Sequence, residues 1–273
     1  MERSDEEIKS AVKEHYGSLA REKRQSCCTP EAQASASCCN TSAAKLYTSE
    51  ELEELPEDIT DFSLGCGNPT AIAELSEGEV VLDLGSGGGL DCFLAAQRVG
   101  VRGRVIGLDM TPEMIRLARE NTQKIGFTNV EFRLGEMEHM PIEDNFIDVI
   151  ISNCVINLSP DKDAVFREAY RVLKPGGRLC VSDIVLLGKL PKEVKESLDQ
   201  WTGCIAGALN EDVYLNKIRA AGFVKVNTDR DSVPFYAECE APQEQSPEGH
   251  QTYLDLSDKV ASIKVKAFKP DKA

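Results

Sequence analysis

Positive charge and long apolar segments are both scarce in this sequence. Its 273 residues include 31 Lys and Arg against 46 Asp and Glu, giving a formal net charge of -15. Because such a chain repels phosphate backbones and anionic bilayers, we expect neither nucleic acid nor a membrane surface as a partner. No apolar run approaches the roughly 18 residues of a spanning helix, and the acidic start MERSDEEIK has no signal-peptide core. We therefore expect a cytoplasmic protein.

Cysteine, in contrast, is abundant, with ten residues. Without a secretory signal we expect these thiols to be reduced and available as ligands or redox groups. Cys66 in GCGNPT, Cys154 in ISNCVINL and Cys204 in WTGCIAGAL have Gly or Asn neighbours. Cys154 also follows a strand-like apolar run, and ligands bind at the carboxyl ends of strands in open α/β sheets, so we expect it to face a ligand. Cys92 and Cys180 are better explained as small buried hydrophobes.

The first part of the chain predicts a helix and then a loop. A capping-box pair, Ser4 and Glu7, precedes apolar residues at helical spacing, which indicates an amphipathic helix over residues 5–24. The next segment, SCCTPEAQASASCCNTS, is small, polar and without periodicity, so we expect a loop. Short helices are expected near residues 49–55 and 69–75.

From Val80 onward, short apolar runs alternate with helical patterns. The expected strands are 80–84, 104–109, 130–134, 146–152 and 178–186, with closing strands at 223–229 and 262–268. The expected helices are 90–99, 112–125, 161–173, 192–200 and 211–221. Strands and helices in alternation predict an α/β fold with a mostly parallel, doubly wound sheet.

The segment VVLDLGSGGGLD places Gly85, Gly87 and Gly89 between a strand and a helix, which predicts a nucleotide-like cofactor. The dinucleotide fingerprint would need glycine where Leu90 stands, so the match to a pyrophosphate binder is imperfect. Asp83 would oppose a pyrophosphate but suit a cationic ligand. S-adenosylmethionine, with its ammonium and sulfonium groups, is such a ligand.

Further cofactor contacts are expected after the next strands. Asp109 in GLDM is placed to accept hydrogen bonds from ribose hydroxyls, although a role as a helix N-cap can coexist because TPEM follows. Met110 can pack beside the adenine, and Glu136 and Met137 in GEMEHMP can contact its amino group and ring face. Asn153 completes the predicted cofactor-binding set.

The glycine loop, the two spaced acids and YRVLKPGGRL at 170–179 resemble the class I S-adenosylmethionine-dependent methyltransferases over roughly residues 70–230. This resemblance implies a Rossmann-like sheet of seven strands, here with an N-terminal helical and loop extension. It also implies S-adenosylmethionine as the methyl donor.

The cysteine motifs are more specific. GCGNPT, SNCVINLSPDK and WTGCIAGAL, with the paired cysteines after the first helix, resemble arsenite methyltransferases of the prokaryotic type over nearly the whole chain. The resemblance implies that Cys66, Cys154 and Cys204 bind trivalent arsenic, delivered as arsenite or its thiol conjugates. Such thiolates are soft ligands for a thiophilic centre, and the bound arsenic keeps a lone pair that can attack the sulfonium methyl without a base. None of the three histidines stands beside ISNCVINL.

The same resemblance implies a redox role for Cys38 or Cys39. One of them would form a disulfide with Cys66 during turnover, and thioredoxin or glutathione would reduce it again. Which member of the pair takes this role is open, the pair Cys27 and Cys28 can compete, and a dispensable tail is an equal alternative. The two pairs lack the spacing of a zinc site.

Three parts follow from these resemblances. Residues 1–48 form an N-terminal helix and Cys-rich loop, residues 49–230 form the methyltransferase domain with the arsenic-site loops, and residues 231–273 form a C-terminal extension with a closing strand. Two other functions stay open. One is methylation of a small carbon or oxygen acceptor such as a quinone precursor, and the other is sequestration of arsenicals by a protein with a vestigial cofactor fold.

Overall fold

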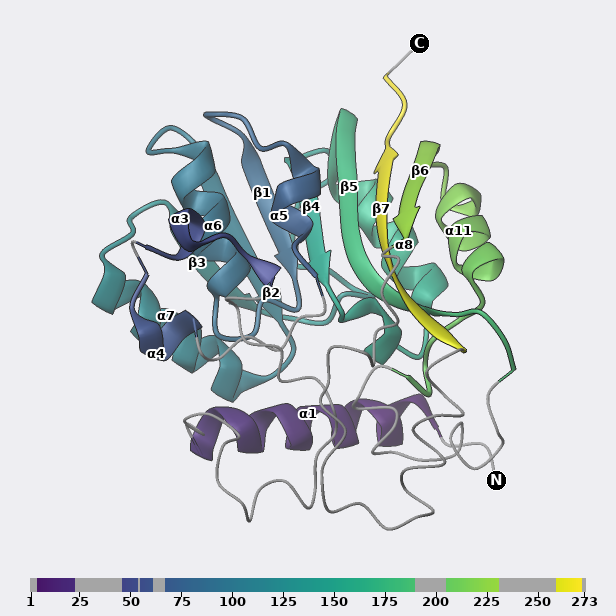
Figure 1. The fold of residues 1–273 in the computed structure, drawn as a ribbon, viewed down its shortest axis with the longest axis horizontal. Coiled ribbons are helices and arrows are strands. Elements are labelled where there is room, and N and C mark those ends of the chain that lie inside the picture. Colours follow the sequence, from purple (N-terminus) through teal and green to yellow (C-terminus); the bar gives the residue numbers. More distant parts are fainter. Residues whose placement is uncertain are drawn as a thin grey trace.

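A seven-stranded sheet forms the centre of the protein (Figure 1), in the order β3-β2-β1-β4-β5-β7-β6. The computed structural model describes residues 4–22, 46–53, 55–60, 67–189, 205–230 and 259–271. The strands are β1 Val80–Leu84, β2 Arg104–Asp109, β3 Val130–Leu134, β4 Ile147–Asn153, β5 Leu173–Leu186, β6 Val224–Arg230 and β7 Val260–Phe268. Strands β1 to β5 pair in parallel, and β7 is antiparallel to both of its neighbours. The predicted mostly parallel seven-stranded fold is confirmed.

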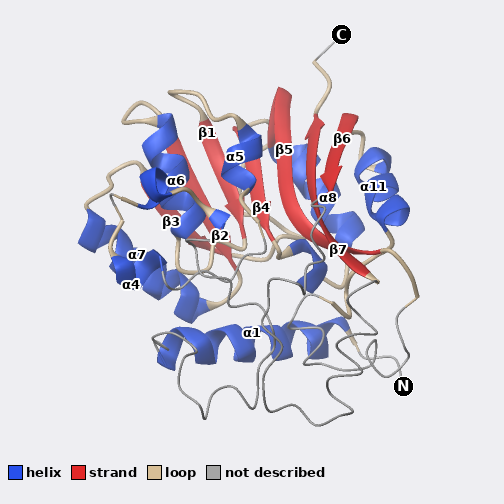
Figure 2. Cartoon of the chain, viewed as in Figure 1, coloured by secondary structure: helices blue, strands red, loops and turns tan. Residues whose placement is uncertain are grey.

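Helices cover both faces of this sheet (Figure 2). They are α1 Asp5–Glu22, α3 Ser49–Leu52, α4 Glu57–Thr60, α5 Pro69–Ala73, α6 Leu90–Val99, α7 Pro112–Ile125, α8 Lys162–Val172 and α11 Glu211–Ala220, with a 3-10 helix η2 at Ile156–Leu158. Successive strand residues point to opposite faces. Val81 therefore packs in one core with Phe93 of α6, and Leu82 packs in the other core with Phe166 of α8.

Most predicted elements agree with the structure to within a few residues, but β5 begins earlier than expected. It starts at Leu173 rather than at 178, because the KPGG segment already belongs to the sheet. The N–H of Gly176 donates to the Lys269 carbonyl at 3.0 Å, and the Lys269 N–H donates to the Gly177 carbonyl at 2.9 Å. The predicted helix at 192–200 lies outside the described residues.

Helix α1 begins with the predicted capping box. The Ser4 N–H donates to the Glu7 carboxylate at 2.8 Å, and the Glu7 N–H donates to the Ser4 hydroxyl at 3.3 Å. The helix runs across the molecule beyond the carboxyl ends of the parallel strands (Figure 1). Arg21 anchors its second half to Glu113 of α7, with 2.6 Å between the charged atoms. The sequence predicted this helix but not where it docks.

Two further predictions concern the organisation of the chain. Within the described ranges, no helix is both long and apolar enough to cross a membrane. The closing strand β7, from the predicted C-terminal extension, lies between β5 and β6 in the same sheet. The division into three parts stays a prediction.

Candidate active site

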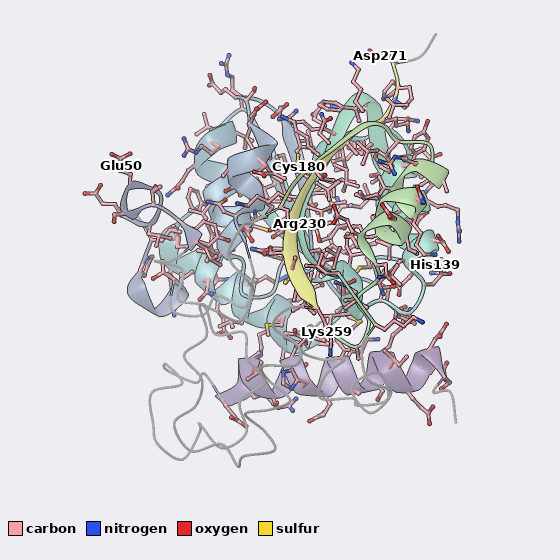
Figure 3. All side chains as sticks on the ribbon, turned by 45° about the vertical axis from the view of Figure 1, so that its right-hand side comes forward. Glu50, His139, Cys180, Arg230, Lys259 and Asp271 are labelled. Atoms are coloured by element: carbon pink, nitrogen blue, oxygen red, sulfur yellow. The ribbon has the colours of Figure 1, made fainter. Side chains whose placement is uncertain are left out.

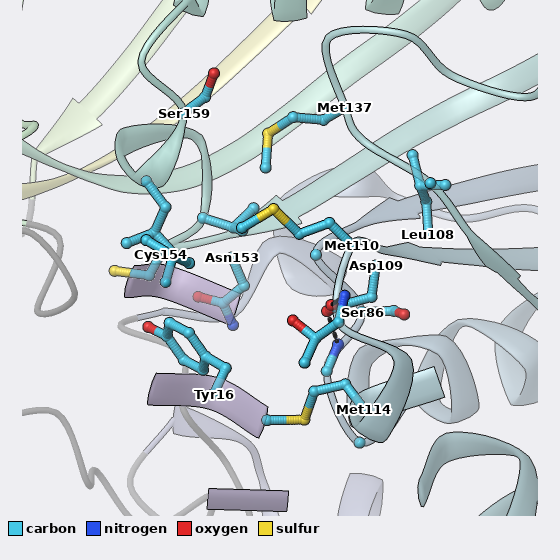
Figure 4. A pocket seen from close by; sticks show the side chains of 18 of the residues that line it. Tyr16, Ser86, Leu108, Asp109, Met110, Met114, Met137, Asn153, Cys154 and Ser159 are labelled. Carbon is cyan, nitrogen blue, oxygen red and sulfur yellow. Dashed lines mark hydrogen bonds between the residues drawn. The ribbon is translucent and has the colours of Figure 1, made fainter. Parts of the chain in front are cut away.

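A pocket opens at the carboxyl ends of β1, β2 and β4 and is bordered by α1 (Figure 4). In the sheet β1 lies between β2 and β4, while the chain visits β2 and β3 before it returns to β4. This point, where the strand order reverses, is where open α/β sheets bind their ligands. The pocket is lined by the loop after β1, the ends of β2 and β4, and the loop after β3.

The glycine loop after β1 is held against β2. The N–H groups of Gly85 and Ser86 both donate to the Leu108 carbonyl, at 2.8 and 3.0 Å. A Cβ on Gly85 would lie 2.3 Å from Val155, so this glycine is required for packing, whereas a Cβ on Gly87 would meet no atom within 4 Å. Gly87 has a φ of 51° and lines the pocket, so its backbone is open to a ligand.

Gly89 has a different environment from the other two predicted glycines. It is the N-cap residue of α6 and does not line the pocket. A Cβ at this position would lie 2.7 Å from Phe93 and 2.9 Å from Phe132. Its role in the structure is therefore close packing of the helix start against β3.

Asp109 at the end of β2 lines the pocket. One carboxylate oxygen accepts from the Gly87 N–H at 3.0 Å, and the other accepts from the Thr111 N–H at 2.8 Å. The N-cap residue of α7 is Thr111, so Asp109 orders the approach to the helix rather than capping it. Burial raises the pKa of Asp109 above its usual range, and a bound cation or donor would favour its charged form.

Asp83, the other predicted acid, does not line the pocket. It is 2% exposed and accepts a hydrogen bond from the Cys92 thiol at 3.2 Å. Burial, followed by the nearby Asp91 charge, raises the pKa of Asp83 well above its usual range. The acid that lines the pocket here is Asp91, in the first turn of α6. Asp91 could have been identified from the sequence as the acidic residue that follows the glycine loop.

After β3, too, the predicted acid lies outside the pocket and a neighbouring acid lines it. Glu136 is 35% exposed and points to α1, where it pairs with Lys9 at 2.7 Å and Lys13 at 3.0 Å. These bonds hold the pKa of Glu136 below its usual range. Glu138 lines the pocket instead and accepts from the Ser159 hydroxyl at 2.6 Å.

Apolar side chains form much of the remaining wall. Met110 and Met137, both predicted from the sequence, line the pocket together with Leu108 and Met114 (Figure 4). Helix α1 adds three residues that sequence reasoning missed, Lys9, Val12 and Tyr16. No local pattern reveals this contribution, because it depends on how α1 docks against the rest of the fold.

Cys154 lies in the pocket wall directly after β4. Its N–H donates to the Ser182 carbonyl at 2.8 Å, and its φ of 57° is in the left-handed region. For a residue with a Cβ this conformation costs about 1 kcal/mol, and such strain is concentrated at functional sites. Figure 4 shows Cys154 and Asp109 on opposite sides of the pocket. The Cys154 sulfur is disulfide-bonded rather than reduced.

The other cysteines divide into two groups. Cys92 and Cys180 are fully buried free thiols, as predicted for packing residues, and burial raises the pKa of Cys180 to about 12. Figure 3 shows Cys180 away from α1. The predicted site cysteines Cys66, Cys204, Cys38 and Cys39, together with Cys27, Cys28 and Cys239, lie outside the described residues. Over the part that is described, no three His, Cys, Asp or Glu side chains are grouped to hold a metal ion.

Asn153, the last residue of β4, forms hydrogen bonds with three other residues of the site through its side chain. Its side-chain oxygen accepts from the Gly67 N–H at 3.2 Å, and its amide nitrogen donates to the Gly67 carbonyl at 2.7 Å. The same nitrogen lies 3.1 Å from the Asp91 carboxylate and 3.2 Å from the Tyr47 hydroxyl. Tyr47 in turn donates to Asp91 at 2.7 Å.

The strand order, the glycine loop at the switch point and the acid at the end of β2 define a class I S-adenosylmethionine-dependent methyltransferase. Residues 75–224 match the family described as "Methyltransferase domain". The chain is 42% identical to an arsenite methyltransferase of Halobacterium salinarum, over 98% of this chain and 68% of that protein. We conclude that it belongs to the arsenite methyltransferase family, as its sequence motifs predicted.

Two further relatives agree. An arsenite methyltransferase of Aquipseudomonas alcaligenes is 40% identical over 68% of this chain and 55% of its own length. The crystal structure of an arsenic (III) S-adenosylmethionine methyltransferase from Chlamydomonas reinhardtii has a TM-score of 0.66 and 32% identity, covering 82% of this chain and 73% of that chain. The chain thus spans about two thirds of the haloarchaeal relative and about half of the bacterial one.

Proposed function

We propose that this chain transfers a methyl group from S-adenosylmethionine to trivalent arsenic bound by its cysteine thiolates, as part of arsenic detoxification. The observation that carries the proposal is the position of Cys154, in the wall of the same pocket that the glycine loop and Asp109 line. A soft ligand and a cofactor loop thereby share one cavity.

The residues of the pocket suit the proposed methyl donor. Asp109 would accept hydrogen bonds from the ribose hydroxyls, and Met110 and Met137 would border the adenine. Gly87 allows a ligand to approach the backbone closely, and Gly85 keeps the loop packed against Val155. We propose Asp91 as the acid that faces the cationic end of the donor, because it lines the pocket and Asp83 does not. Asp83 and Gly89 then support the loop from behind, and Glu136 anchors α1.

The arsenic would be held by Cys66, Cys154 and Cys204, the ligand set that the family resemblance implies. When bound, S-adenosylmethionine supplies a methyl group on a positively charged sulfur. The arsenic lone pair forms the new arsenic–carbon bond, the carbon–sulfur bond breaks, and its electron pair remains on S-adenosylhomocysteine. No proton has to leave the acceptor, so the protein's task is to hold the two centres in line.

Methyl transfer oxidises arsenic from the trivalent to the pentavalent state, so each cycle needs two electrons from thiols. We propose thioredoxin or glutathione as the source, with Cys38 or Cys39 paired to Cys66 as the relay, in the cytoplasm. A reductant is needed because only a thiolate binds a soft metalloid. This scheme assigns the Cys-rich loop within residues 1–48 to redox exchange, residues 49–230 together with the pocket residues of α1 to catalysis, and residues 231–273 to completion of the sheet.

The test is to incubate the purified, reduced protein with arsenite, S-adenosylmethionine and a thiol, and to separate arsenic species by chromatography with mass detection. We expect methylated arsenic to accumulate over many turnovers. Cys154→Ser should reduce the rate at least about 100-fold while S-adenosylmethionine still binds, since about 3 kcal/mol of transition-state stabilisation is removed. Cys180→Ala, a thiol outside the pocket, is the matched control and should retain methylation. Full activity in Cys154→Ser would refute the proposal.

The alternative acceptor, a quinone precursor or another carbon or oxygen nucleophile, has less support. The relatives that match 98% and 68% of the chain are both arsenite methyltransferases. Sequestration without turnover predicts stoichiometric arsenite binding and no methylated product, which the same experiment detects.

A further inference from the structure

The side chain of Asn153 holds both backbone polar groups of Gly67. Its oxygen accepts from the Gly67 N–H at 3.2 Å, and its nitrogen donates to the Gly67 carbonyl at 2.7 Å. An amide side chain that pairs with one peptide unit in this way fixes the segment in both position and orientation. Asn153 and Gly67 are 86 residues apart in the sequence, so the contact joins two distant parts of the chain.

Gly67 is also pressed against β5. A Cβ at Gly67 would lie 1.8 Å from the Ser182 hydroxyl oxygen and 2.8 Å from the Ser182 Cβ. The Ser182 carbonyl accepts from the Cys154 N–H at 2.8 Å. One residue of β5 therefore touches Gly67 with its side chain and binds Cys154 with its backbone.

Both contacts stand next to the proposed arsenic ligands. Cys154 follows Asn153 in the sequence, and Cys66 precedes Gly67. Consecutive Cα atoms are about 3.8 Å apart across a trans peptide, so fixing Gly67 against Asn153 restricts the chain that carries Cys66.

We propose that Asn153 is a positioning residue, which holds the Gly67 segment so that the thiols of Cys66 and Cys154 are presented to one arsenic atom. The proposal rests on the function proposed above for these two cysteines. Asn153 is therefore a positioning residue here, whereas the sequence predicted that it binds the cofactor. Its amide oxygen and nitrogen are engaged with Gly67, Asp91 and Tyr47, so the side chain supports the site rather than binding the cofactor directly.

The physical basis is the effective concentration of one thiol at another. Once Cys154 has bound arsenic, each further thiolate binds in an intramolecular step, whose advantage depends on how well that thiol is held. Releasing the Gly67 segment lowers this local concentration without removing a ligand. We therefore expect weaker arsenite binding and a higher KM for arsenite, with a smaller loss of affinity for S-adenosylmethionine, because Asn153 also donates to Asp91.

The first test is Asn153→Leu, which keeps a similar volume and removes the amide. Arsenite affinity of the reduced protein is measured by equilibrium dialysis with mass detection of arsenic, and S-adenosylmethionine affinity by calorimetry. We expect the Kd for arsenite to rise about 10-fold or more, and the Kd for S-adenosylmethionine to rise by a clearly smaller factor, through the lost hydrogen bond to Asp91. Unchanged arsenite affinity would overturn the proposal, and so would an equal loss of affinity for both ligands, which would indicate a direct cofactor contact.

The second test displaces the Gly67 segment through its contact with Ser182. It tests the positioning role even if Asn153→Leu does not fold. Gly67→Ala introduces a Cβ that collides with Ser182, and the double variant Gly67→Ala/Ser182→Gly removes the colliding atoms. Arsenite affinity should fall in the single variant and recover in the double variant. Failure of the double variant to recover would count against positioning through Gly67.

The wild-type protein separates the two proposals. If it does not methylate arsenite, the proposed function fails. If it does, and the variants bind arsenite as the wild type does, only the positioning role fails.

Discussion

Two clusters of the same three side-chain types lie at the carboxyl ends of β4 and β5. In the first, which we call the open cluster, Asn153 and Tyr47 both donate to Asp91, at 3.1 and 2.7 Å. In the second, the closed cluster, Asn157 and Tyr214 both donate to Asp183, at 2.8 and 3.1 Å. Burial raises the pKa of both tyrosines well above their usual range, followed by the neighbouring carboxylate.

The clusters differ in what surrounds them. Asn153 and Asp91 line the pocket, and the Asn153 side chain also forms hydrogen bonds with the backbone of Gly67. In the closed cluster all three side chains are 0% exposed and none lines that pocket, and Asn157 also donates to the Ile184 carbonyl at 2.6 Å. Similar hydrogen bonds therefore border the pocket in one place and lie in the closed core in the other.

The largest expected difference is between the two asparagines. Asn157→Ala should lower the free energy of unfolding by about 3 to 4 kcal/mol, because it leaves the Ile184 carbonyl without its donor and opens a cavity in a dry core. Asn153→Ala should cost only about 1 to 2 kcal/mol, since water can enter from the pocket. Urea unfolding measures both. Equal losses would mean that the cavity beside the open cluster makes no energetic difference.

The second comparison uses pH. Burial raises the pKa of Asp183 to about 6, against about 3.9 in an unfolded chain. The folded state therefore binds a proton that the unfolded state has released, so the stabilising contribution of Asp183 is present at low pH and is lost as pH rises through about 6. Between about pH 4 and pH 7 the wild type should lose about 3 kcal/mol relative to Asp183→Asn. Parallel stability curves for the two proteins would show that Asp183 does not titrate in this window.

The smallest expected effects come from the tyrosine hydroxyls. Tyr47→Phe and Tyr214→Phe each remove one hydrogen bond to a carboxylate and should each cost about 1 to 2 kcal/mol. Their effects on function should differ, because only Tyr47 belongs to the open cluster. We expect Tyr47→Phe to raise the KM for arsenite and Tyr214→Phe to leave it unchanged, measured with the methylation assay on folded protein. A raised KM in Tyr214→Phe would break the distinction between the clusters.

Part of the predicted site lies in the pocket. Gly85, Gly87, Asp109, Met110, Met137, Asn153 and Cys154 all line the pocket. Each of them stands at or just after the end of a strand, or in the loop that follows it, where the chain order itself gives the location. Asp83, Gly89 and Glu136 do not line it. Their places are set by packing partners in the folded chain, Cys92 for Asp83, Phe93 for Gly89 and Lys9 for Glu136.

The contributions of α1 and of the open cluster could not be derived from sequence. Lys9, Val12 and Tyr16 lie within the predicted amphipathic helix, and nothing in its pattern indicates which surface the helix covers. Tyr47 and Asp91 had no assigned role. Their contact with Asn153 bridges 106 and 62 residues of chain, and such separations leave no local pattern.

By itself, the sequence determined the elements, their order and the chemistry available, because hydrophobic periodicity, glycine loops and thiol motifs are local properties of the chain. Only the tertiary structure decided which groups meet. The docking of α1, the grip of Asn153 on Gly67 and the separation of an open from a closed cluster all depend on contacts between distant segments. Those contacts form only when burial of both faces of the sheet brings these segments together.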